Sequence, residues 1–133
     1  MGKLFVADSR ESARDEVEGA EPFATLPWPG DYFFLFPDIK RLQEETGELI
    51  DPQKDAYFAG PAMDALAEFV RVCRARTASQ PVTWRQRVGT SRPTQEVVYG
   101  LADRARILEF LEKVEHTIDR AREARKGVFF QGE

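Results

Sequence analysis

The chain has 133 residues and is mildly acidic, with 23 Asp and Glu residues against 19 Lys and Arg residues. This length and a hydrophobic fraction of 42% suffice for one hydrophobic core without disulfide or metal staples. The single cysteine, Cys73, excludes an intrachain disulfide and a thiolate zinc cluster, and no apolar run could cross a bilayer, so we expect one cytoplasmic domain over residues 1–133.

The N-terminal segment combines a short strand with an acidic stretch and a turn-rich stretch. Residues 3–7 are mainly apolar and extended, which predicts a strand. Residues 8–21 are acidic and favour either a short surface helix or a mobile segment. Prolines 22, 27 and 29 then predict turns, with Trp28 covering a hydrophobic edge.

The next segment opens with the most apolar run in the chain. Residues 32–36 are continuously apolar and have the length of a buried central strand. Pro37 suits the first turn of a helix, which we expect to end at Gly47. Residues 48–52 and 53–58 then predict a hairpin of two short strands.

The second half predicts the two main helices. Apolar residues recur at three- and four-residue spacing over 61–77 and over 101–126. Between them, residues 82–88 alternate, which indicates a strand, and residues 95–99 are its expected hairpin partner. Residues 128–131 predict a final strand. The pattern favours an α+β fold in which a small, mainly antiparallel sheet packs against the helices 61–77 and 101–126.

Residue types that commonly carry catalysis are sparse. His116, the only histidine, falls on the polar face of its helix, and Cys73 falls on an apolar stripe. Phosphate-binding glycine loops are absent from the sequence. The acidic cluster around residues 44–55 lacks the spacing of a calcium loop and is interpreted as solvated turn residues. We therefore expect no catalytic residue, no metal and no cofactor.

The strongest signal is a window of arginines without acidic residues. Residues 1–68 hold 15 acidic and 6 basic residues, whereas residues 69–95 hold no acidic residue and six arginines. Helical and strand spacing divides the window into two pairs, Arg71 with Arg74 and Arg85 with Arg87. Guanidinium groups suit carboxylates and phosphates, so these four residues are the candidate binding residues.

Three interpretations of this window remain open. The acidic first half of the chain could neutralise the arginines internally. They could instead bind an acidic patch on another protein. Nucleic acid is disfavoured because the chain is acidic, with a pI near 5.2, and because Trp84 points to the opposite strand face from Arg85 and Arg87.

Two short stretches carry a resemblance to a group of proteins. They are residues 46–52, Thr-Gly-Glu-Leu-Ile-Asp-Pro, which continue to Asp55, and residues 126–133, Lys-Gly-Val-Phe-Phe-Gln-Gly-Glu. Together they resemble segments of small bacterial proteins, some of which look like immunity proteins of toxin systems. Glu133 stands where that pattern has Asp. The resemblance implies a compact α+β fold and a binding role, and it assigns no catalytic residue.

The leading hypothesis is therefore a non-enzymatic bacterial protein, immunity-like, that binds an acidic partner protein through segregated surface charge. One alternative is a small enzyme whose carboxylates and arginines assemble from distant segments. Another is a structural subunit of a homo-oligomer. A membrane partner is not expected.

Overall fold

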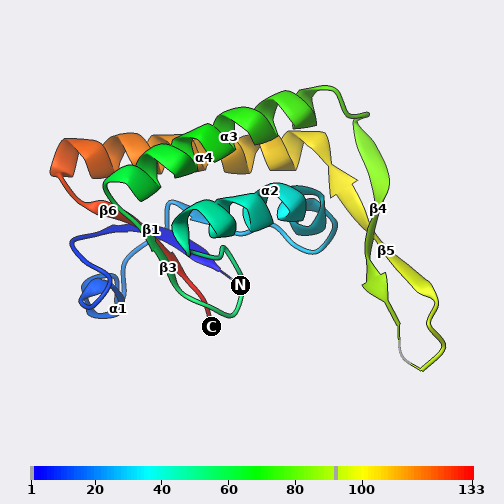
Figure 1. Ribbon diagram of the computed structural model, residues 1–133, viewed down its shortest axis with the longest axis horizontal. Coiled ribbons are helices and arrows are strands. Elements are labelled where there is room, and N and C mark those ends of the chain that lie inside the picture. Colours follow the sequence, from blue (N-terminus) through cyan, green and yellow to red (C-terminus); the bar gives the residue numbers. More distant parts are fainter. Residues whose placement is uncertain (1, 92) are drawn as a thin grey trace.

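The computed structural model describes residues 2–91 and 93–133, which form helices and antiparallel sheets (Figure 1). This confirms the predicted α+β fold class. A four-stranded sheet has the order β2-β1-β6-β3, and a separate two-stranded sheet pairs β4 with β5. The two sheets belong to two parts of the molecule with different surroundings.

Strands from the two ends of the chain form the centre of the larger sheet. β1, Lys3–Ala7, pairs antiparallel along its whole length with β6, Gly127–Gln131. β2, Ala24–Thr25, and β3, Ala56–Phe58, lie on the outer sides of this pair. The predicted strands at 3–7 and 128–131 are therefore confirmed.

Successive side chains of the central strands point to opposite faces of this sheet, and each face packs against a different hydrophobic cluster. Leu4 and Phe130 belong to the main core under the long helices, whereas Phe5 and Phe129 belong to a second, smaller cluster. That cluster includes Ala13, from the short helix α1, Ala13–Glu16. A four-residue helix therefore lies within residues 8–21.

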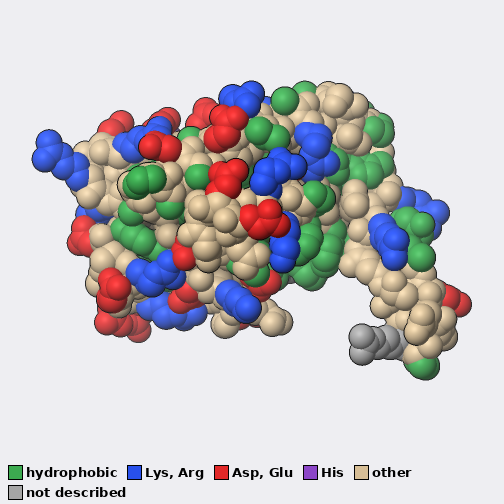
Figure 2. Space-filling view, viewed as in Figure 1, with side chains coloured by type: hydrophobic (Ala, Val, Ile, Leu, Met, Phe, Trp, Pro, Cys, Tyr) green, Lys and Arg blue, Asp and Glu red, His purple; other side chains and the backbone are tan. Residues whose placement is uncertain are grey.

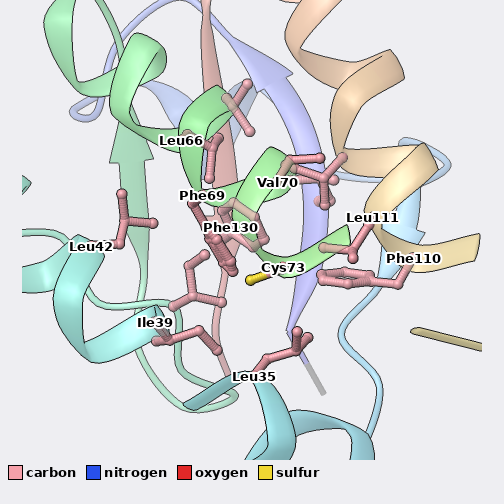
Figure 3. Packing of buried hydrophobic residues seen from close by; sticks show 14 of the residues in the cluster. Leu35, Ile39, Leu42, Leu66, Phe69, Val70, Cys73, Phe110, Leu111 and Phe130 are labelled. Atoms are coloured by element: carbon pink, nitrogen blue, oxygen red, sulfur yellow. The ribbon is translucent and has the colours of Figure 1, made fainter. Parts of the chain in front are cut away.

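Three long helices cover the opposite face. They are α2, Gly30–Thr46, α3, Pro61–Ala78, and α4, Arg104–Ala124. α3 and α4 run side by side, with α2 beneath them in the view of Figure 1. Figure 3 shows how leucine, isoleucine and phenylalanine side chains from all three helices meet Cys73 and Phe130 in the core. We call this sheet with its helices the body.

The strand predicted at residues 32–36 is wrong, because these residues lie in α2. The buried residues Tyr32, Leu35, Ile39 and Leu42 recur at three- and four-residue intervals, which is helical spacing. A short apolar run does not separate a buried strand from a buried helix, and here the pattern beyond Pro37 decides. The expected start of the helix at Pro37 is also wrong, because α2 begins at Gly30 and Pro37 lies inside it. Gly47 ends the helix in the left-handed conformation, as predicted.

Two further boundaries differ from prediction. The hairpin expected over residues 48–58 is reduced to one bridge between Asp51 and Lys54, and β3 pairs with β6 instead. The last helix begins at Arg104 and not at Leu101, because Asp103 caps it: its carboxylate accepts from the Arg106 backbone N–H at 3.0 Å. The preceding residues extend the second strand of the hairpin.

β4, Thr83–Thr90, and β5, Val97–Asp103, form the predicted hairpin, although it is longer than expected. It leaves the end of the helical layer and projects beyond the body (Figure 1). A bulge between Arg87 and Gly89 shifts the register halfway along. We call this hairpin, residues 82–103, the arm.

Candidate functional site

The base of the arm packs against the N-terminal half of α2. The Trp84 ring meets the Phe34 ring edge-on, with centroids 4.9 Å apart. Gly30 allows the backbones to approach closely, since a Cβ atom there would lie 2.4 Å from the Leu101 carbonyl oxygen. The inner face of the arm is thereby fixed to the body.

A buried carboxylate adds a polar anchor at the same place. Asp31 is 1% exposed, and its side chain accepts from the Asp103 backbone N–H at 2.8 Å and from Arg106 Nε at 2.8 Å. One carboxylate thus joins α2, the end of β5 and the start of α4. The geometry indicates that the base of the arm is held rigidly, because a buried charge is stable only when its hydrogen bonds are formed.

The outer face of the arm has a different character. Strand pairing places Arg85 opposite Leu101 and Arg87 opposite Tyr99, and all four side chains are exposed. The Arg85 guanidinium lies over the Tyr99 ring at 4.4 Å from its centroid. Basic and hydrophobic side chains lie side by side on the arm in Figure 2. With Val97, which continues the row on β5, these residues define the arm face.

The arm also carries most of the exposed hydrophobic side chains of the described chain. Six large hydrophobic residues are notably exposed, and five of them lie on the arm: Val82, Val97, Val98, Tyr99 and Leu101. The sixth, Trp28, is 42% exposed and lines a hollow of about 420 Å³ together with Leu101. The arm face therefore continues through this hollow to Trp28.

The arginines of α3 are engaged by acidic residues. Arg71 pairs with Glu68, and Arg74 Nη1 lies 2.9 Å from a carboxylate oxygen of Glu115. These two candidate binding residues therefore belong to a charge-paired helix surface. The hydrogen bond and the charge of Glu68 raise the pKa of Arg71, which is cationic in any case.

Arg76 is tied into the body more tightly. It pairs with the buried Asp38 at 2.8 Å, donates to the Phe34 carbonyl, and stacks on the Phe34 ring at 3.9 Å. Internal neutralisation is thus the outcome for the three arginines of α3. Arg92, the last arginine of the window, lies outside the described residues.

Arg85 and Arg87 differ, since neither forms an ion pair with an acid of the described chain. The predicted pairs are therefore on separate elements, one neutralised and one open to solvent. Their face does hold an aromatic ring, Tyr99, which sequence reasoning missed because β5 supplies it. The alternation of Val97, Tyr99 and Leu101 was the available signal.

His116 and Cys73, residue types that commonly carry catalysis, lie in surroundings that do not form a catalytic group among the described residues. His116 is exposed and touches only the Phe23 ring among the described aromatic contacts. Cys73 is fully buried, and that burial raises the pKa of its thiol far above the ordinary value, which disfavours the reactive thiolate. Tyr32 is also buried, which with the nearby Asp51 raises its pKa to about 12.

The acidic cluster around residues 44–55 contributes to the fold. Asp55 forms a bidentate pair with Arg14, at 2.6 and 2.8 Å, and accepts from the Gly132 N–H. Glu48 pairs with Arg10 and accepts from the Tyr57 N–H. Within residues 2–91 and 93–133, no group of three His, Cys, Asp or Glu side chains is placed to hold a metal ion.

Comparison of the chain with protein-family models, with curated proteins and with solved structures finds no match. Within the described chain, no helix is both long enough and apolar enough to cross a membrane. The geometry of the arm is therefore the main guide to function.

Proposed function

We propose that this is a protein-binding protein and that the arm face docks on a partner protein whose surface combines an acidic patch with apolar residues. The observation that carries the proposal is the composition of the arm face: Arg85 and Arg87 have no acidic partner in the described chain, and they lie among exposed Tyr99, Leu101 and Val97. Arginine and tyrosine are enriched among the residues that dominate binding energies.

The arm suits binding because its conformation is set in advance. Trp84 and Asp31 hold its base, and the Arg85 guanidinium is stacked on Tyr99 before any partner arrives. A side chain that is ordered in the free protein loses less entropy on binding. Arginine also pairs with carboxylates through two parallel hydrogen bonds, which favours an acidic partner.

An immunity-like role is the specific form of this proposal, in which the partner is a toxin protein. Its support is the resemblance of residues 46–52 and 126–133 to small bacterial proteins of that kind. The product of the adjacent gene is the first candidate partner to test.

The experiment compares two charge-reversed variants in a quantitative binding assay against that product. Arg85→Glu with Arg87→Glu changes the arm face, whereas Arg71→Glu with Arg74→Glu makes the same change in net charge on α3. We expect the arm variant to weaken binding at least about 100-fold and the helix variant to weaken it less than about fivefold.

Equal losses in both variants would show that net charge matters and the arm does not. Binding that is insensitive to the arm variant would overturn the proposal. Light scattering on the purified chain separates the homo-oligomer alternative, since a stable oligomer that dissociates in the arm variant would make a second copy the partner.

A further inference from the structure

We propose that a groove beside the start of α2 binds an organic cation of the alkylammonium class. The groove has a volume of about 470 Å³ and is open to solvent. Four aromatic side chains line it, those of Trp28, Tyr32, Phe33 and Phe36, together with Asp51 and Pro52. The proposal concerns a different surface from the arm face, although Trp28 borders both.

The aromatic wall is formed by rings that pack at an angle to one another. The Trp28 ring centroid lies 5.3 Å from that of Phe33 and 5.2 Å from that of Tyr32, and both pairs are tilted. Phe33 and Phe36 are tilted likewise, at 6.3 Å. Phe33 and Phe36 are half-buried and Trp28 is 42% exposed, so ring surface remains available to a ligand.

The charge of the groove distinguishes it from an ordinary apolar depression. Among the described residues, its lining includes the carboxylate of Asp51 and no lysine or arginine. Glu133 also lines the groove, but its carboxylate already has a partner and is not counted toward the ligand. The Asp51 side chain accepts from the Gln53 backbone N–H at 2.7 Å, which fixes its position. The charge of Asp51 also contributes, after burial, to the raised pKa of Tyr32, one of the aromatic residues that line the groove.

An aromatic wall and a carboxylate together select a cation that carries apolar groups. The face of an aromatic ring attracts cations through its quadrupole, most strongly for tryptophan. Methyl or methylene groups on the cation replace water against the rings, and the carboxylate supplies the opposite charge. A free quaternary ammonium compound and a lysine side chain of a peptide share this chemistry.

The test uses the indole N–H signals of the two tryptophans in a nuclear magnetic resonance titration. Choline should shift the Trp28 signal saturably, in the millimolar range, and leave the Trp84 signal in place because Trp84 packs on Phe34 at the base of the arm. The neutral isostere 3,3-dimethylbutanol should bind about fivefold more weakly. Equal binding of the two compounds, or no saturable shift, would overturn the proposal.

Two variants test the two walls separately. Asp51→Asn keeps an oxygen acceptor for Gln53 and should weaken choline binding about fivefold, whereas Asp64→Asn removes an exposed carboxylate on α3 and should leave it unchanged. Phe33→Leu keeps an apolar wall and should weaken choline more than the neutral isostere. If Asp51→Asn and Asp64→Asn behave alike, a specific cation site is refuted.

A lysine-containing peptide, with norleucine in place of lysine as its control, identifies the source of the cation. Tighter binding of the lysine peptide than of choline points to a protein ligand, and the reverse order points to a small molecule. A peptide that binds, and does so equally well with lysine or norleucine, contradicts the proposal. The variant Arg85→Glu with Arg87→Glu should bind choline normally. Failure of this proposal and failure of the arm proposal can therefore be told apart.

Discussion

The body and the arm use the same residue types in opposite ways. In the body, arginines such as Arg76 are held by buried carboxylates, and leucines such as Leu111 are fully buried. On the arm, Arg85 has an aromatic ring but no described acid beside it, and Leu101 is 56% exposed. In the body, these charged and apolar side chains are paired or buried within the chain itself. The arm instead leaves apolar area and positive charge exposed, where another molecule could cover them.

The most demanding test of this contrast replaces leucine in each region. Leu111→Ala should reduce the free energy of unfolding by about 2–5 kcal/mol, because the cavity lies in a fully packed core. Leu101→Ala should change it by less than about 0.5 kcal/mol, as exposed substitutions do. Urea denaturation measures both. A large loss for Leu101→Ala would mean that the arm face supports the fold.

Substitution of Asp31, which joins the arm to the body, should give the next largest loss of stability. Asp31→Ala removes the acceptor of Arg106 and of the Asp103 N–H, and it should reduce the free energy of unfolding by about 2–3 kcal/mol. This loss is smaller than for a fully buried ion pair, because Arg106 is half exposed. Hydrogen exchange should rise at β5 and the start of α4 before it rises in β1. The exposed pair of Asp64 with Arg122 provides the control, since Asp64→Ala should be nearly silent.

A substitution at the closely packed base of the arm should reduce stability by a smaller amount. Gly30→Ala would place a methyl group 2.4 Å from the Leu101 carbonyl oxygen, so the arm must shift, at a cost of about 1–3 kcal/mol. In a Trp28→Phe background, the fluorescence of Trp84 reports this shift, because Trp84 lies at the same junction. An unchanged emission spectrum and unchanged stability would show that the junction is looser than described.

The smallest effect concerns alkaline pH in the body. The folded-state pKa of Tyr32 is raised to about 12 from 10.0, so its stabilising contribution is complete below pH 10 and is lost as the pH rises toward 12. Between pH 9 and 11 the wild-type chain should lose about 1 kcal/mol more than Tyr32→Phe. Parallel stability curves for the two proteins would contradict burial of this phenol.

Sequence reasoning recovered the elements whose periodicity is unambiguous. The spacing of Phe69, Val70 and Cys73 identified α3, and the alternation around Trp84 identified β4 with Arg85 and Arg87 pointing outward. It failed at residues 32–36, because a run of five apolar residues fits a buried strand and a buried helix alike. Only the continuation to Ile39 and Leu42 separates them, and the proline at 37 obscured that continuation.

The candidate site was only half predictable for a related reason. The charges of Arg71 and Arg85 look equivalent in the sequence, and the fold alone supplies Glu68 and Glu115 to α3 while supplying Tyr99 to the arm. The pairing of β4 with β5 brings Tyr99 and Leu101 beside the arginines, and β5 extends to Asp103, beyond the strand predicted over residues 95–99. That boundary is set by the Asp103 cap and its contact with Asp31.

The most direct test of the proposed docking surface is site-specific photocrosslinking to the adjacent-gene product. A photoreactive phenylalanine analogue is placed at Tyr99 on the arm face or at Glu112, an exposed position on α4. If the arm face docks on the partner, a crosslink forms from position 99, is lost in Arg85→Glu with Arg87→Glu, and does not form from position 112. Equal crosslinking from both positions, or from position 112 alone, would contradict the account.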